Sequence, residues 1–163
     1  MKIKLIIGVA FVAIIAVAAF VVAGGGTKLN AAELEKMRGT EGYYAEQEML
    51  SFADPMGPLP PELIATCADA PKVIKFAFDV QYRLGKEWAE TPEMATEAFT
   101  KKMVEVRSNM ILMIASKTSS EITGGSAVAF LEEVRRTLNE VVFPKKMARV
   151  ERVLIKQMFV QGL

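Results

Sequence analysis

The sequence predicts an α+β protein in which a single N-terminal transmembrane helix precedes a β-β-α-α-β domain with helices packed on a small sheet. Three observations predict this fold. The first is an uncharged apolar run at 5–23, and the second is a strict alternation of apolar residues at 73–84. The third is helical periodicity between Thr91 and Pro144, which is followed by a second alternating run at 148–161. The corresponding segments are a cytoplasmic N-terminus at 1–4, a transmembrane helix at 5–23, a linker at 24–61 and a domain at 62–163 on the outer side of the membrane.

The apolar run at residues 5–23 contains no charged or polar side chain. A helix of this length measures about 28 Å, close to the ~30 Å hydrocarbon core of a bilayer, and it satisfies its own backbone hydrogen bonds there. Lys2 and Lys4 precede the run, so the positive-inside rule places the N-terminus in the cytoplasm and the remainder outside. Ala19 and Ala23 have the small-xxx-small spacing that suits packing against another transmembrane helix.

A cleaved signal peptide is the alternative interpretation of the same segment. Val21-Val22-Ala23 would serve as a cleavage site, and the short basic N-terminus suits a signal sequence. The apolar cores of signal peptides are usually shorter, about 7–15 residues, which favours an uncleaved anchor. Cleavage would instead release a soluble periplasmic protein.

The linker at 24–61 begins with the flexible Gly24–Gly26. Asn30 is followed by an acid three residues later, at Glu33, and this pattern predicts a short helix near residues 31–38. The sequence DPMGPLPP at 54–61 excludes a helix or an inner strand, because proline lacks an amide donor and fixes φ.

Two runs after the linker predict a β-hairpin. Residues 62–67 form a short apolar run, and ADAPK then forms a turn. The following segment, at 73–84, alternates apolar and polar side chains and therefore reads as a strand with one buried face. The apolar positions are Ile74, Phe76, Phe78, Val80, Tyr82 and Leu84.

Two helices follow the hairpin. Thr91-Pro92 is a helix start, and an apolar stripe continues from it with a predicted break near Ser108 and an end before Gly124-Gly125. The second helix begins at Ser126 and stops at Pro144. The apolar stripes consist of Ala95, Phe99, Met103, Val106, Met110 and Met113 in the first helix, and Ala127, Leu131, Val134, Leu138 and Val141 in the second.

The C-terminal segment at 148–161 predicts a strand with apolar side chains on both faces. Simple alternation places Val153, Ile155 and Phe159 on one face. Leu154, Met158 and Val160 are then on the other. A tail of this kind would expose a large apolar area, so we expect the strand to pair into the sheet and to be covered.

Composition argues against catalysis. Formal net charge is +1, which gives no nucleic-acid footprint. The chain has no histidine, the side chain most used for acid–base catalysis, and Cys67 is its only cysteine, so an internal disulfide is excluded. We expect no catalytic, cofactor-binding or metal site, and a protein that works by contact.

The order of segments and two motifs resemble the flagellar basal body-associated protein family FliL. One motif lies within the first predicted helix and is matched by Arg107, Ile111, Leu112, Ile114, Ser116 and Lys117. The other ends the chain and is matched by Val150, Val153, Ile155, Phe159, Val160 and Gln161. The chain departs from the family pattern at Ala65-Thr66-Cys67 and at Gln157.

The resemblance implies a bitopic inner-membrane protein of the flagellar basal body, whose periplasmic domain is similar to the stomatin-type SPFH domain. It implies a homo-oligomeric ring around the periplasmic stem of the motor stator's peptidoglycan-binding subunit, with neighbouring copies covering the terminal strand. Such a ring would stabilise the engaged, ion-conducting stator and support motility. The implied partners are other copies, stator subunits, basal body components and the membrane.

Two other functions remain open from the sequence. A general SPFH-like membrane scaffold without a flagellar link would need the same fold and the same tendency to form rings. A periplasmic binding protein freed by signal cleavage would begin near Gly24 and contain an apolar pocket.

Overall fold

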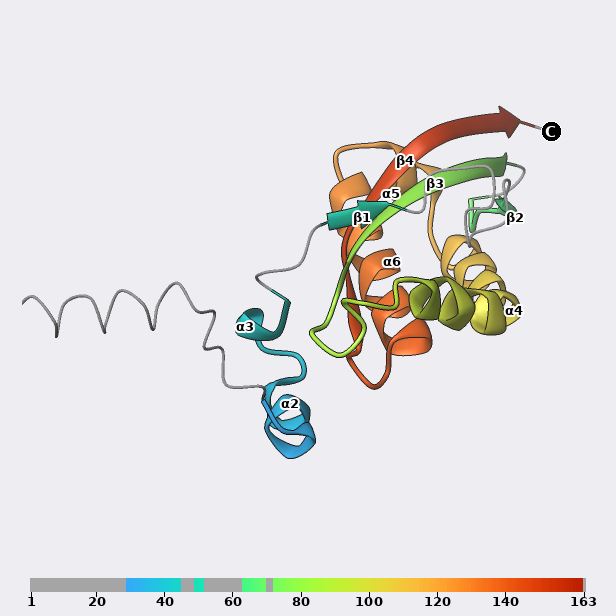
Figure 1. Ribbon diagram of the computed structural model, residues 1–163. Coiled ribbons are helices and arrows are strands. Elements are labelled where there is room, and N and C mark those ends of the chain that lie inside the picture. The colour runs from blue at the N-terminus through green and yellow to red at the C-terminus, as the bar shows by residue number, and fades with distance from the viewer. Residues whose placement is uncertain (1–28, 45–48, 52–62, 70–71, 163) are drawn as a thin grey trace, which may run out of the picture. The chain divides into compact units, whose positions relative to one another are not determined.

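The computed structural model describes residues 29–44, 49–51, 63–69 and 72–162, shown in colour in Figure 1. The chain divides into two units, Met1–Glu33 and Leu34–Leu163, and the second contains the sheet. The predicted transmembrane segment at 5–23, with Ala19 and Ala23, lies outside the described residues. Among the helices that are described, none has both the length and the apolar character needed to cross a bilayer.

Three short elements lie within the segment predicted as a linker. The predicted short helix is confirmed as α2 (Ala31–Met37), and Asn30 and Glu33 exchange side chain–backbone hydrogen bonds of 2.9 Å at its start. Gly39 follows α2 with a φ of 87°, a left-handed conformation that glycine adopts without strain. Helix α3 (Glu41–Tyr44) and strand β1 (Met49–Ser51) come next, and β1 pairs with the central strand of the sheet.

The sheet is small and antiparallel throughout. Strand β3 (Lys72–Leu84) is central; β1 and β2 (Leu63–Thr66) pair along one side of it, and β4 (Ala148–Gly162) pairs along the other. The predicted hairpin is confirmed as β2–β3, and the predicted terminal strand as β4. Figure 1 shows β3 and β4 running side by side over their length.

The helices differ from the prediction at one point. Helix α4 (Glu93–Ala115) passes through Ser108 without a break, because no glycine or proline interrupts it and its inward side chains stay buried. The break comes later, where Thr118 and Glu121 form a capping box that starts α5 (Ser119–Thr123). Helix α6 (Ala127–Val142) then begins after Ser126 and ends before Pro144, as predicted.

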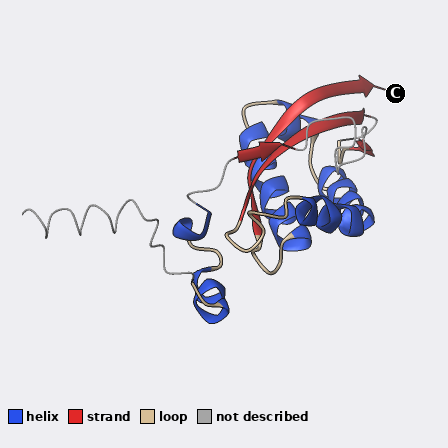
Figure 2. Cartoon of the chain, viewed as in Figure 1, coloured by secondary structure: helices blue, strands red, loops and turns tan. Residues whose placement is uncertain are grey.

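Helices α4, α5 and α6 cover one face of the sheet, as Figure 2 shows. Every second residue of β3, from Ile74 to Leu84, points towards these helices, while the residues between them lie on the other face. The buried contacts between the layers form the core. Its largest side chains from the sheet and these helices are Phe76, Phe99, Phe130, Ile74, Met110, Ile114, Ile122 and Leu138.

The two faces of β4 are not those that simple alternation predicts. The pairing with β3 shifts register between Gln81 and Tyr82 and again between Ala77 and Phe78, so β4 holds an extra residue at each point. Each such bulge reverses which face the next side chain occupies. After the second bulge Met158 lies opposite the buried Phe76, and Phe159 lies opposite Lys75.

Both predicted groupings are therefore wrong, that of Val153, Ile155 and Phe159 on one face and that of Leu154, Met158 and Val160 on the other. Val153 and Ile155 share the helix-covered face with Met158, and Phe159 shares the outer face with Leu154.

Candidate functional site

A segment that the sequence analysis placed in the linker is fastened to the domain by side chains. We call residues 38–44 the strap. Arg38 donates two hydrogen bonds of 2.8 Å to the Glu87 carboxylate, and the Tyr43 hydroxyl donates a third of 2.6 Å. The hydrogen bonds from Arg38, and secondarily from Tyr43, lower the pKa of Glu87 to about 2. The strap is thus held by a charged network on the turn that follows β3.

Close packing fixes the strap at the same point. The Tyr43 ring is completely buried and lies against Gly85. A Cβ atom on Gly85 would overlap the ring carbons of Tyr43 and lie 2.7 Å from its hydroxyl oxygen. Gly85 does not have a positive φ, so glycine is needed here for the close approach of the ring and not for backbone conformation.

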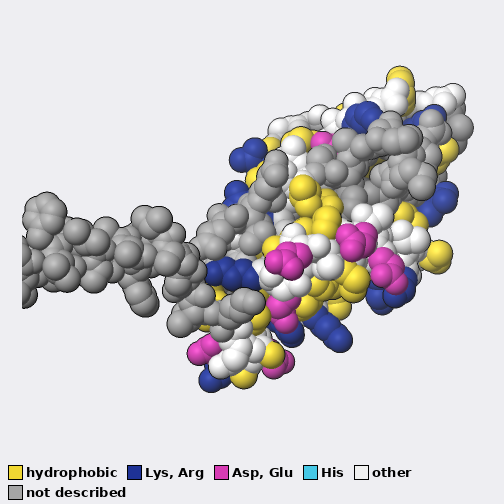
Figure 3. All heavy atoms as spheres, in the orientation of Figure 1, with side chains coloured by type: hydrophobic (Ala, Val, Ile, Leu, Met, Phe, Trp, Pro, Cys, Tyr) yellow, Lys and Arg dark blue, Asp and Glu magenta, His cyan; other side chains and the backbone are white. Residues whose placement is uncertain are grey.

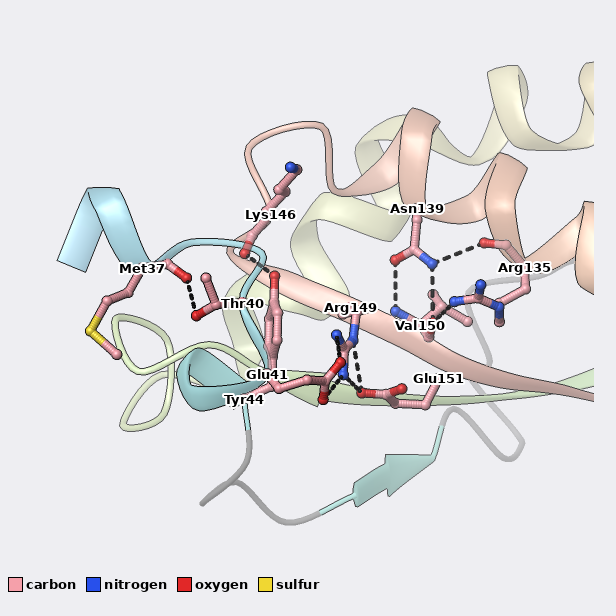
Figure 4. A network of polar contacts seen from close by, with 10 residues as sticks. All are labelled: Met37, Thr40, Glu41, Tyr44, Arg135, Asn139, Lys146, Arg149, Val150 and Glu151. Carbon is pink, nitrogen blue, oxygen red and sulfur yellow. Dashed lines mark hydrogen bonds and ion pairs between the residues drawn. The ribbon is translucent and has the colours of Figure 1, made fainter.

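The other end of the strap is held by Arg149 on β4 (Figure 4). Arg149 binds the Glu41 carboxylate through two hydrogen bonds of 2.7 and 3.0 Å, contacts Glu151, and stacks its guanidinium 4.5 Å from the centre of the Tyr44 ring. The hydrogen bonds to Glu41 raise the pKa of Arg149 and lower that of Glu41. The buried Tyr44 also donates a 2.6 Å hydrogen bond to the carbonyl of Lys146.

An asparagine on α6 fastens β4 to the helix layer at the first bulge. The Asn139 side chain accepts a hydrogen bond of 2.8 Å from the amide of Val150 and donates one of 3.0 Å to its carbonyl. The same amide group donates to the carbonyl of Arg135 at 3.0 Å. Asn139 therefore occupies the position of a neighbouring strand for one residue of β4, as Figure 4 shows.

A pocket of about 480 Å³ opens between the strap, α6 and β4. Its floor includes Phe143, Pro144 and Ala148, and the cations around it are Arg135, Arg136, Lys146 and Arg149. Three of these cations already hold carboxylates, since Arg135 binds Glu132, Arg136 pairs with Glu140, and Arg149 binds Glu41 and Glu151. This pairing leaves little net positive charge for an anionic ligand.

A second polar cluster ties the hairpin to the corner between α4 and α5. The amide and hydroxyl of Ser119 donate hydrogen bonds of 2.8 and 2.7 Å to the Asp69 carboxylate, and these bonds lower the pKa of Asp69. Lys72 donates to the Ser119 hydroxyl at 2.9 Å. The nearby Cys67 is buried, and burial raises the pKa of its thiol. The cluster serves packing at this corner.

The motif residues predicted from the sequence fall into two groups. Val150 and Val153 are buried, and Ile155 and Ile111 are partly buried against the core. Arg107 and Leu112 are exposed on α4, and Phe159, Val160 and Gln161 are exposed at the end of β4. The buried group packs in or against the core, whereas the exposed group lies on the surface of the domain.

Sequence reasoning missed the strap and its partners. The signal was present in the adjacent aromatics Tyr43 and Tyr44, which would be unusual in an exposed linker. The capping pattern at Thr118–Glu121 was also available and would have placed the helix break correctly.

No part of the described chain has the donors of a metal centre, since no group of three or more His, Cys, Asp or Glu could hold an ion there. On the face drawn in Figure 3, acidic and basic side chains both occur, and apolar side chains reach the surface between them.

Comparison with known proteins identifies the domain. A search of the curated proteins finds no match. A family model, described as flagellar basal body-associated protein FliL, matches residues 56–161, a region that contains the β2–β3 hairpin, all three helices of the core and nearly all of β4. Because the match covers most of the chain, the protein belongs to the flagellar basal body-associated FliL family.

Proposed function

We propose that the protein is a non-enzymatic component of the flagellar motor, which forms a homo-oligomeric ring around the periplasmic stem of the stator. The observation that carries the proposal is the family match over residues 56–161, which supports a place in the flagellar basal body. The ring and the stator partner go beyond the family match. Exposed apolar side chains of α4 support them.

The proposed architecture is a bitopic inner-membrane protein. The uncharged run at 5–23 spans the bilayer, the few residues before it stay in the cytoplasm, and the domain is periplasmic. Residues 24–37 then form the tether, because the strap fastens the chain from Arg38 onwards to the body of the domain. A tether this short confines each domain near the membrane surface and raises the effective concentration of neighbouring copies.

The exposed stripe of α4 supports contact between copies. Val104 is 84% exposed and Leu112 is 66% exposed, on a helix that is otherwise seated on the sheet and on α6. Two large apolar side chains and the exposed Arg107 on one helix are typical of an interface. Because α4 lies over β2 whereas α6 lies over β4, this stripe is at one margin of the domain. A contact between unlike margins is the kind that closes into a ring.

The proposed mechanism is a shift of population. A ring that binds the extended form of the stator stem more tightly than the compact form favours the engaged, ion-conducting state. An anchor on every copy adds avidity without new contacts. No bond is made or broken by the protein in this mechanism.

The direct test is recovery of partners from native membranes. Affinity purification of the tagged full-length protein should recover stator subunits, and cross-linking in the membrane should give a ladder of oligomers. Deletion should reduce swimming or swarming under high load while filaments persist. Stator subunits absent from the recovered material, together with normal motility under load, would refute the stator assignment.

A matched pair of variants tests the α4 contact. Leu112→Asp should abolish the cross-linked ladder. Val128→Asp, on the exposed side of α6 and 76% exposed in the parent protein, should leave it intact. Equal ladders for both variants would show that copies meet through another surface.

A further inference from the structure

The strap and β1 lie outside the part of the chain that the family model matches. The match begins at residue 56, after β1 ends at Ser51. The hydrophobic core that the longer strands and the three helices build contains neither Tyr43 nor Tyr44, although both rings are buried. The two rings pack edge to face against each other, with their centres 4.9 Å apart. The strap therefore has a small core of its own, separate from that of the domain.

The attachments of the strap and β1, which we together call the latch, are few compared with those inside the sheet. Strand β1 pairs with β3 through three residues, whereas β4 pairs with β3 along the whole of β3. The Glu41 side chain that binds Arg149 is 80% exposed, and an ion pair of this kind contributes little to stability. Local unfolding begins in parts with few buried apolar contacts, so we expect the latch to open more easily than the body of the domain.

The latch lies at the point where the tether joins the domain. Helix α2, which precedes it, has no buried residue. Within the described chain, Arg38 is the first residue whose side chain donates hydrogen bonds to the body of the domain. After the latch, the next described residue is Leu63, at the start of β2. The latch is thus the connection through which any pull on the tether reaches the sheet.

We propose that the latch opens from the domain as one unit while the sheet and helices stay folded, and that opening adds residues 38–62 to the tether. The tether then grows from 14 residues, at 24–37, to 39 residues, at 24–62. The 25 added residues span at most about 80–90 Å when extended. This inference rests on the proposed function, in which the chain is anchored in the membrane, because only an anchored chain has a tether to lengthen.

Tension along the tether drives the opening. The open state allows a greater distance between the membrane and the domain, so tension shifts the population towards it. The latch closes again when the tension falls, since Gly85 and Glu87, which receive Tyr43, belong to the folded body. The latch therefore lets an anchored domain follow a partner at different heights above the membrane without unfolding.

Hydrogen exchange of the full-length chain in detergent tests whether the latch opens by itself. Exchange is read by mass spectrometry on peptides from the strap, β1, α4 and α6, at urea concentrations below the unfolding transition. The latch should exchange at least tenfold faster than α4 and α6, and its rate should depend less on urea because opening exposes less surface than global unfolding.

Variants of the main core separate latch opening from global unfolding. Ile114 is fully buried in that core, so Ile114→Ala should speed exchange in α4 and α6 at least tenfold and change exchange in the latch by less than twofold. Should the alanine variant fail to fold, Ile114→Val removes a single methyl group and should speed exchange in α4 and α6 at least twofold while leaving the latch unchanged.

A matched pair of carboxylate variants tests whether the latch is one unit. Glu87→Gln should speed exchange in the strap and in β1 by the same factor, at least fivefold, although Glu87 contacts only the strap among the two. Glu133→Gln, which removes a carboxylate that binds Lys117 at 2.7 Å on the helix layer, should change exchange in the latch by less than twofold.

Optical tweezers measure the length that the latch releases. The handles are attached at Ala32→Cys and Gly125→Cys in a Cys67→Ser background, because a Cβ atom at Gly125 meets no atom within 4 Å. A first step at low force should release about 80–90 Å of contour length, before a second step that unfolds the sheet and helices. Glu87→Gln should lower the force of the first step, and Ile114→Val should lower only that of the second.

Three results would overturn the proposal. The first is equal acceleration of the latch and of α4 and α6 by the Ile114 variants, since the latch would then open only when the domain unfolds. The second is acceleration of the strap without β1 in Glu87→Gln. The third is a single unfolding step under force. Neither measurement involves the stator or other copies, so failure of the latch and failure of the stator assignment are seen separately.

Discussion

Replacing Gly85 by alanine should detach the strap from the domain. The added Cβ would overlap the Tyr43 ring, and neither partner can easily move. The ring is fully buried, and its hydroxyl is held by Glu87 at 2.6 Å. The substitution therefore forces the ring out of its site.

The cost follows from what the ring loses. Exposing a large buried side chain costs about 1.5–3 kcal/mol, and losing a hydrogen bond to a charged group costs about 1.5–3 kcal/mol. Alanine restricts the unfolded chain and returns about 0.4–1 kcal/mol. We expect Gly85→Ala to lower the free energy of unfolding by about 2–5.5 kcal/mol, which corresponds to a fall in Tm of about 6–20 °C for a domain of this size.

Urea unfolding followed by circular dichroism measures this cost, and limited proteolysis should show cleavage within residues 38–44 in the variant. A double-mutant cycle with Tyr43→Ala isolates the cause. Once the ring is absent, Gly85→Ala should cost less than about 0.5 kcal/mol, because the added Cβ then meets no ring. The same cost in both backgrounds would refute the overlap as the reason.

Three further predictions test the network, the bulge and the asparagine. The pKa of Glu87 falls from an ordinary 4.5 to about 2 on folding, so its contribution to stability is present above pH 4.5 and is lost as the pH falls towards 2. Between these pH values, the free energy of unfolding of Glu87→Gln should therefore depend less on pH than that of the wild type. Val153→Ser should lower the free energy of unfolding by about 2–4 kcal/mol and Leu154→Ser by less than about 1 kcal/mol, since only Val153 is buried; similar costs in urea unfolding would contradict the face assignment. Asn139→Ala should cost about 1–3 kcal/mol by the same measurement and speed hydrogen exchange at the Val150 amide, and an unchanged exchange rate would mean that Asn139 does not hold that amide.

Much of the fold could be predicted from local pattern. The alternation at 73–84 corresponds to β3, the stripe that begins after Thr91-Pro92 corresponds to α4, and the boundaries of α6 follow from Ser126 and Pro144. These signals are local because side-chain period and capping depend on residues only a few positions apart. The family motifs also lie within short stretches of the chain, which is why the resemblance could be recognised from the sequence. The family match then confirmed it.

The strap could not be predicted in the same way. Arg38 and Glu87 are 49 positions apart, and Glu41 and Arg149 are 108 positions apart, so no window of sequence shows that they meet. Composition alone made the segment look like a connector. Its attachment became visible only when the sheet brought the turn after β3 and the start of β4 together.

The sequence by itself determined the main elements of the domain, which are β2, β3, β4, α4 and α6, together with the absence of histidine and the family of the domain. Only the tertiary structure decided which face of β4 each side chain occupies. The physical reason is that a bulge is defined by the partner strand: an extra residue exists only relative to the register of β3, and each one reverses the face of all that follows. The exposure of Phe159, and with it the open surface at the end of the chain, is therefore a property of the assembled sheet.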